Sequence, residues 1–253
     1  MNKIVLITGS TSGIGKACAE KFAQHNYDII ITGRRKQRQD NLKKELEAKC
    51  NIEVLPLCFD VRKREDVIKS LENLEDRWKK IDVLVNNAGL ALDLKPLQDG
   101  DFDDWDTMID TNLKGLLYMS KLVSGMMIKR GTGHIINIGS IAGKEAYPNG
   151  NVYCATKHAV EGLTKAMRLD LFKHGIKVSQ LAPGAAETEF SVVRFKGDPG
   201  RAKKVYDGYK PLTGEDIAES IYFMASQPEH VNINDLLIMP VAQANATTFD
   251  KIR

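Results

Sequence analysis

The strongest constraint on the fold of this 253-residue chain is the glycine-rich segment after its first apolar run. The run 3–8 is short and β-branched, as a buried strand is, and the pattern at 14–25 is helical. Between them, Gly9, Gly13 and Gly15 permit a tight turn and a close approach of the backbone to a ligand. A strand, a glycine turn and a helix in this order bind phosphate, because the first amides of the helix point their free N–H groups at an anion.

Short apolar runs alternate with helical patterns along the rest of the chain, which is typical of a parallel sheet covered on both faces. The expected strands are 3–8, 28–33, 53–59, 81–86, 134–140, 176–182 and 235–240. The expected helices are 14–25, 37–49, 63–79, 102–130, 153–173 and 214–226. No linker or repeat divides the chain, so we expect one doubly wound, Rossmann-type α/β domain over 1–253, with a parallel sheet of about seven strands.

One segment does not follow this alternation. Residues 191–214 are rich in Lys, Arg, Gly and Pro and show little periodicity. Such a stretch is either a solvated surface loop or a mobile lid over the substrate. The second interpretation draws on its position after an expected strand, at the edge where open α/β sheets bind ligands.

The composition argues against several classes of function. Lys+Arg 36 against Asp+Glu 33 gives a net charge of +3, without the basic stripe that nucleic-acid binding needs. No apolar stretch reaches the roughly 18 to 20 residues of a membrane helix. The cysteines form no CxxC pair and have no histidine at metal-ligand spacing: Cys18, Cys50, Cys58 and Cys154. We therefore expect no nucleic acid, membrane, metal or disulfide, and a reducing cytoplasm as the location.

The glycine spacing selects among phosphate-binding loops. A P-loop needs Gly-Lys-Ser/Thr after four intervening residues, whereas here Lys16 is followed by Ala17, so the NTPase interpretation fails. Gly9 and Gly13 are separated by three residues, which also differs from the common GxGxxG. A dinucleotide pyrophosphate fits this loop, and a glycine turn without a ligand is the remaining alternative.

The end of the expected strand 28–33 indicates which dinucleotide binds. In such folds an acidic residue there favours a free ribose 2′-OH and arginine favours a 2′-phosphate. Here Arg34 and Arg35 occupy that place, and no Asp or Glu lies between Asp28 and Asp40. We therefore expect NADP(H) rather than NAD(H), held by charge-assisted bonds to these arginines. The alternative is a pair of surface arginines.

Tyr153 and Lys157 stand four residues apart at the start of an expected helix, so both side chains lie on one face. An adjacent ammonium group lowers the pKa of a tyrosine toward the range of a useful base. Ser140 ends the expected strand 134–140, where its hydroxyl can hold a substrate oxygen beside Tyr153. Alone, a Tyr-x-x-x-Lys pair arises by chance in many helices.

Together these residues resemble the short-chain dehydrogenase/reductase family, and the resemblance covers essentially the whole chain. It rests on motifs in the family's order: Thr8-Gly9-x-x-x-Gly13-Ile14-Gly15, Asn86-Asn87-Ala88-Gly89, Asn112, Ser140, Tyr153-x-x-x-Lys157 and Pro183-Gly184-x-x-x-Thr188. Single motifs have simpler explanations, such as a turn at 86–89 or a helix cap at Asp60. Their joint occurrence in register argues against these.

The resemblance implies a role for each catalytic residue. Tyr153 is the acid/base, Ser140 orients the carbonyl, Lys157 binds the nicotinamide ribose and lowers the tyrosine pKa, and Asn112 holds a proton-relay water. With the glycine loop and the two arginines, the expected cofactor contacts are Gly9, Ser10, Thr11, Ser12, Gly13, Ile14, Gly15, Arg34, Arg35, Asp60, Val61, Asn87, Ala88, Gly89, Tyr153, Lys157, Pro183, Gly184 and Thr188.

Longer stretches are similar to a narrower group, the NADP-dependent serine, L-allo-threonine and 3-hydroxy acid dehydrogenases: 87–92, 108–112, 150–153, 188–197 and 230–234. Such enzymes act on small β-hydroxy acids, and Arg194 is the candidate cation for the substrate carboxylate, with Ser140 at the reacting oxygen. Ala185 and Ala186 are smaller than the residues expected after Pro183-Gly184, which leaves the pocket size open.

Two other functions remain open from the sequence. A 3-oxoacyl-carrier-protein reductase shares the catalytic residues and the NADPH preference, and Lys/Arg near 129–130 and 201–204 would give it a docking surface. A non-catalytic NADPH-sensing protein would use the same fold, although the intact Ser140, Tyr153 and Lys157 argue against it. The resemblance also implies a homotetramer.

Overall fold

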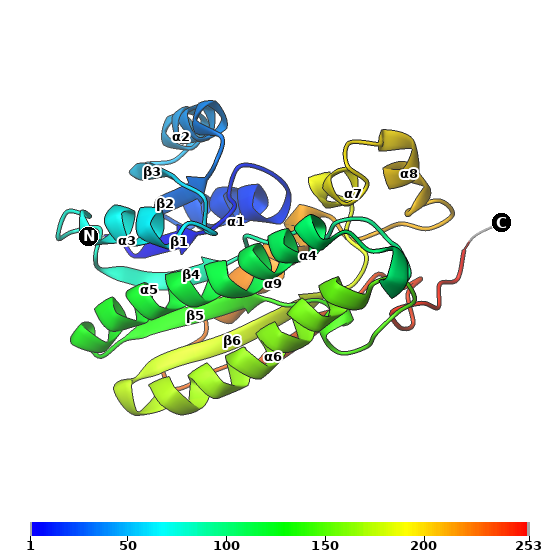
Figure 1. Ribbon diagram of the computed structural model, residues 1–253. Helices are drawn as coiled ribbons and strands as arrows, with labels where there is room; N and C mark the ends of the chain where they lie inside the picture. The colour runs from blue at the N-terminus through cyan, green and yellow to red at the C-terminus, as the bar shows by residue number, and fades with distance from the viewer. Residues whose placement is uncertain (1, 252–253) are drawn as a thin grey trace.

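The computed structural model describes residues 2–251, so Met1, Ile252 and Arg253 of the expected domain 1–253 lie outside the described residues. Its centre is one seven-stranded sheet in the order β3-β2-β1-β4-β5-β6-β7, in which every neighbouring pair is parallel (Figure 1). The strands are β1 Ile4–Ile7, β2 Asp28–Gly33, β3 Val54–Cys58, β4 Ile81–Asn86, β5 Gly133–Ile138, β6 Ile176–Pro183 and β7 Asp235–Ile238. The expected Rossmann-type fold is confirmed.

Helices cover both faces of the sheet. They are α1 Gly13–Gln24, α2 Lys36–Lys49, α3 Arg64–Glu72, α4 Phe102–Ile109, α5 Leu116–Arg130, α6 Asn151–Leu171, α7 Glu189–Arg194, α8 Pro199–Lys204 and α9 Gly214–Ala225. Val5 and Ile7 of β1 join the core beneath α1, α2 and α9. Ile4 and Leu6 join the opposite core, beneath α3, α5 and α6. Alternate residues of one strand thus fill both layers, which is why β1 is apolar without interruption.

The prediction of a helix over 63–79 was wrong beyond residue 72. α3 ends at Glu72, and the chain continues through turns in which the Trp78 amide donates to the Glu75 carbonyl. These turns bring the Trp78 side chain into the core, where it is 6% exposed, and place Arg77 against its ring. Burial of the large indole therefore outweighs continuation of the helix.

Two further segments differ from the expected pattern. The expected helix 102–130 is divided by a π-helical turn, Asp110–Gly115, between α4 and α5. The segment 191–214 forms most of α7 and all of α8 instead of an irregular loop. Each of these short helices has a side-chain cap, from Thr188 and Asp198 respectively, and such caps do not appear in an apolar periodicity.

Among the described residues, no helix is long and apolar enough to span a membrane.

Candidate active site

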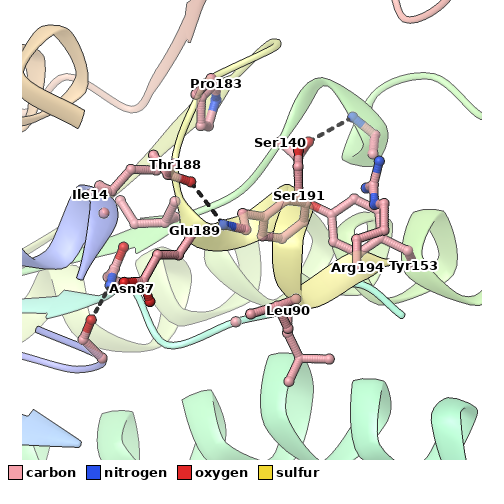
Figure 2. A pocket seen from close by; sticks show the side chains of 18 of the residues that line it. Ile14, Asn87, Leu90, Ser140, Tyr153, Pro183, Thr188, Glu189, Ser191 and Arg194 are labelled. Atoms are coloured by element: carbon pink, nitrogen blue, oxygen red, sulfur yellow. Dashed lines mark hydrogen bonds between the residues drawn. The ribbon is translucent and has the colours of Figure 1, made fainter. Parts of the chain in front are cut away.

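A cavity of about 520 Å³ lies at the carboxyl ends of the parallel strands, where open α/β sheets bind ligands (Figure 2). It is lined by nineteen of the residues singled out in the sequence: Gly9, Thr11, Ser12, Gly13, Ile14, Arg34, Arg35, Asp60, Val61, Asn87, Ala88, Gly89, Ser140, Tyr153, Lys157, Pro183, Gly184, Thr188 and Arg194. Three others, Ser10, Gly15 and Asn112, do not line it. Those three support the residues that do.

The glycine loop has the geometry of an anion cradle. Gly9 and Gly13 have φ of +67° and +51°, in the left-handed region that glycine adopts at little cost. A Cβ at Gly15 would lie 2.4 Å from the Gly9 carbonyl oxygen, so only glycine lets the loop close on the helix. The N-cap Ser12 makes no side-chain cap bond, and the first turn of α1 holds no acidic residue. The first amides of α1 are therefore free to bind a pyrophosphate.

Asn87 braces this loop. Its Nδ2 donates to the Thr8 and Gly9 carbonyl oxygens at 2.8 and 3.2 Å. The Thr8 hydroxyl in turn accepts from the Asn87 and Ala88 amides, both at 2.9 Å. Buried Ser10 donates to the Thr32 carbonyl oxygen at 3.1 Å and so ties the loop to β2. These polar groups hold the loop against the end of β4 and β2.

Basic residues gather at the far end of the cavity, beyond β2. Arg34 and Arg35 are exposed there, and Arg35 donates through Nη2 to the Thr11 and Ser12 hydroxyls, each at 2.9 Å. Asp60 follows β3 and accepts two hydrogen bonds from the Nε atom of Arg62 and one from its Nη2 atom. Burial raises the pKa of Asp60, but Arg62 outweighs this and holds it below its usual value. This end therefore carries fixed charges of both signs.

Ser140, Tyr153 and Lys157 meet at the other end. Ser140 caps the short turn Ile141–Gly143 after β5, and its Oγ accepts from the Ala142 amide at 3.1 Å. Tyr153 and Lys157 lie in the first two turns of α6 and are 8% and 6% exposed. The Lys157 ammonium donates to the Ile138 carbonyl oxygen at 2.8 Å and lies 5.9 Å from the centre of the Tyr153 ring. The sequence spacing is thus realised as one buried cluster.

In the cofactor-free protein, burial has the largest effect on the pKa values of Tyr153 and Lys157. It raises the pKa of Tyr153, an effect only partly opposed by the Arg194 cation and the Ser140 hydroxyl. It also lowers the pKa of Lys157 from 10.5 to about 8. The cation that opposes the effect of burial on the pKa of Tyr153 in this arrangement is Arg194, and the expected lowering of the tyrosine pKa by Lys157 stays a prediction.

Asn112 lies within the π-helical turn between α4 and α5. Its Nδ2 donates to the Leu90 carbonyl oxygen at 2.8 Å and to the Thr156 hydroxyl at 3.0 Å. Its Oδ1 accepts from the Leu90 amide at 2.9 Å. A single-turn π-helix is often found at functional sites. Here it turns Asn112 toward α6 and fixes the segment after β4.

Arg194, the last residue of α7, lies over the tyrosine. Its guanidinium carbon is 5.2 Å from the centre of the Tyr153 ring and 4.9 Å from that of Phe190. Its Nη2 donates to the Tyr147 hydroxyl at 3.1 Å, whereas its buried Nε has no hydrogen-bond partner. A buried guanidinium N–H without an acceptor is costly, and an anion in the cavity would satisfy it.

Several lining residues were not anticipated. Tyr147 and Phe190 flank Arg194, Gln243 accepts from the Ala185 amide at 2.8 Å, and Glu189 contacts Arg35. The sequence carried a signal for Glu189 and Phe190, which follow the motif residue Thr188 within the stretch 188–197. Tyr147 and Gln243 reach the cavity from separate segments through folding alone.

The fold and this cluster define a nucleotide-dependent dehydrogenase, and comparison with known families agrees. Residues 3–198 match the family described as short chain dehydrogenase. The chain belongs to this family.

Three relatives illustrate the similarity. The NADP-dependent 3-hydroxy acid dehydrogenase YdfG of Escherichia coli (strain K12) is 46% identical over 244 residues, covering 96% of this chain and 97% of that protein. Sulfoacetaldehyde reductase 2 of Chromohalobacter salexigens is 44% identical over 245 residues, covering 96% of each. The closed form of serine dehydrogenase complexed with NADP⁺ has a TM-score of 0.91 at 45% identity, covering 99% of this chain and 100% of that one.

Proposed function

We propose that this chain is an NADP(H)-dependent oxidoreductase that interconverts a small β-hydroxy acid, of the serine, L-allo-threonine or 3-hydroxypropionate type, and its 3-oxo acid. One observation supports the substrate class above the others. The buried Nε of Arg194 lacks a partner while the guanidinium lies 5.2 Å from the Tyr153 ring. A carboxylate bound there puts a β-hydroxyl within reach of the tyrosine.

The residues around the cavity divide the work of the reaction. Bound NADP(H) supplies or accepts the hydride. Tyr153 donates its proton to the substrate oxygen during reduction and removes it during oxidation. Ser140 orients that oxygen, and Lys157 adds positive charge that favours the phenolate once the cofactor is bound. Asn112 fixes the segment after β4 and would hold the proton-relay water that the family resemblance implies.

The cofactor's parts match the chemistry along the cavity. The pyrophosphate binds the free amides of α1, which carry no acidic neighbour in the first turn. Arg34 and Arg35 would bind the 2′-phosphate, and Asp60 and Val61 would border the adenine. Residues 183–188 would border the nicotinamide, as the family resemblance implies. Asn87, by contrast, contributes through the loop that it braces.

Arg35→Ala is expected to weaken NADP⁺ binding by about tenfold or more, because it removes a charge-assisted bond to the phosphate, and to change NAD⁺ binding little. Calorimetric titration of both cofactors measures the two Kd values. Arg64→Ala is the matched control, since Arg64 is exposed and pairs with its neighbour Glu65. Equal weakening for both cofactors would contradict the phosphate assignment.

Arg194→Ala is expected to raise KM for 3-hydroxypropionate by about 10- to 100-fold, because a hydrogen bond to a charged group is lost at a buried site. Its effect on the Kd of NADPH is expected to be small. Arg201→Ala serves as control, because Arg201 stacks on Phe195 in the same segment. An unchanged KM in Arg194→Ala would remove the substrate-carboxylate assignment.

We also propose that 191–214 acts as a substrate lid, since Arg194 belongs to it and Val205, Tyr206 and Tyr209 line the same cavity.

A homotetramer is proposed as the assembly. Exposed apolar side chains on α5, α6 and the turn after α6 support it: Leu117, Ile128, Leu169 and Phe172. A reducing cytoplasm is the proposed location, in keeping with the four free cysteines.

A further inference from the structure

One carboxylate joins the basic end of the cavity to the lid. Glu189, the first residue of α7, lies beside Thr188 at the edge of the cavity (Figure 2). It accepts from Arg35 Nη1 at 3.1 Å and from Arg38 Nη1 at 2.8 and 3.0 Å. Arg35 lies two residues after the end of β2 and Arg38 lies in the first turn of α2, so the contact spans segments about 150 residues apart in the chain.

The donors of Arg35 are nearly all committed. A guanidinium has five N–H groups. In Arg35, Nε and Nη2 donate to the Thr11 hydroxyl, Nη2 also donates to Ser12, and Nη1 donates to Glu189. A phosphate that takes a two-point contact with this side chain must therefore displace one of these acceptors. The carboxylate is the acceptor of the same chemical class, an anion with two oxygens on a guanidinium.

The contact is suited to displacement. Burial raises the pKa of Glu189, but Arg38 and Arg35 outweigh it and keep the carboxyl ionised at neutral pH. The side chains of Arg35, Arg38 and Glu189 are 43%, 48% and 46% exposed, and ion pairs this exposed contribute little to stability. A phosphate monoester carries nearly two negative charges near neutral pH and competes well against one.

From these contacts, and resting on the proposed assignment of NADP(H) to this cavity, we propose that Glu189 competes with the cofactor 2′-phosphate for Arg35 and Arg38, and so limits the preference for NADP(H) over NAD(H). NAD(H) has no 2′-phosphate and leaves the ion pairs closed. NADP(H) must displace Glu189 to reach the arginines. Its 2′-phosphate therefore gains less binding free energy than it would from two arginines that had no carboxylate partner. Because Glu189 begins the helix that ends at Arg194, its release also frees the start of α7 from α2.

The test uses two small probes that lack nicotinamide, 2′,5′-ADP and 5′-AMP, titrated calorimetrically into the full chain. Glu189→Gln removes the charge and keeps the side-chain shape. We expect it to tighten 2′,5′-ADP and NADPH by about three- to tenfold, since a competing ion pair is lost, and to change 5′-AMP by less than about twofold. Glu187→Gln is the control, two residues away and exposed. Glu189→Ala repeats the test without the amide.

Other outcomes overturn the proposal. Unchanged or weaker 2′,5′-ADP binding in both Glu189 variants would mean that the carboxylate positions the arginines instead of competing with phosphate. Equal tightening of 5′-AMP would mean a general charge effect. Failure of the proposed cofactor site is distinguishable, because Arg35→Ala would then leave 2′,5′-ADP binding unchanged whatever the Glu189 variants do.

Discussion

Replacement of Tyr153 by Phe is expected to lower kcat by about a thousandfold or more, within the range that a positioned acid/base contributes. The ring remains and keeps its contact with Phe190, whose centre lies 5.7 Å away, so the cavity retains its shape. Only the proton donor is lost. NADPH binding should change by less than about twofold, because that binding draws on the glycine loop and the arginines.

Steady-state kinetics in both directions, together with NADPH fluorescence titration, measure these two effects. Tyr147→Phe is the matched control: it removes a half-buried hydroxyl from the same cavity, one that accepts from Arg194. That variant should act mainly on KM. Retention of kcat in Tyr153→Phe, or an equal loss of kcat in Tyr147→Phe, would remove the acid/base assignment.

Lys157→Met is expected to abolish most activity and yet stabilise the cofactor-free protein at pH 7. Burial lowers the pKa of Lys157 from 10.5 to about 8, so at neutral pH the folded state holds a poorly solvated charge. A lowering of this size corresponds to about 3 kcal/mol. Loss of the hydrogen bond to the Ile138 carbonyl oxygen offsets part of this, which leaves an expected gain of about 1 to 2 kcal/mol.

The pH dependence of this gain follows from the depressed pKa. Below about pH 8 the lysine is charged in both states and its destabilising effect is fully present. Between pH 8 and 10.5 the unfolded chain binds more protons, so the wild type becomes more stable as pH rises. The advantage of Lys157→Met should therefore shrink over this range. Denaturant unfolding at pH 7 and pH 10 measures it, and an advantage that grows with pH would contradict the account.

The sheet could be predicted from the sequence because its parallel strands are buried on both faces. A run such as that of β1, whose residues fill two cores in alternation, has almost no other stable arrangement. The glycine loop could also be predicted, since Gly15 admits no Cβ beside the Gly9 carbonyl oxygen. Where the local geometry admits only one residue type, as at Gly15, that residue in the sequence is enough to predict the geometry.

What could not be predicted depends on contacts between distant segments. The end of α3 is decided by burial of Trp78 against the core. α7 and α8 are a different case, because they begin at local caps that an apolar periodicity does not show. Nothing local indicates that Glu189 meets Arg38 or that Tyr147 meets Arg194. The pKa of Tyr153 is a similar case, because the spacing to Lys157 says which charge is near but not how deeply the pair is buried.

The reaction proposed for this cavity is the oxidation of a small β-hydroxy acid by NADP⁺, together with its reverse. The direct test measures NADP⁺ reduction by purified protein with L-serine, L-allo-threonine and 3-hydroxypropionate, alongside NADPH oxidation by a 3-oxoacyl thioester. We expect turnover of at least one hydroxy acid with NADP⁺, little turnover with NAD⁺, and little with the thioester, which lacks the carboxylate for Arg194. Turnover of the thioester alone would contradict the account and favour a 3-oxoacyl-carrier-protein reductase. Tight NADPH binding without turnover of any of these compounds would also contradict it and favour an NADPH sensor.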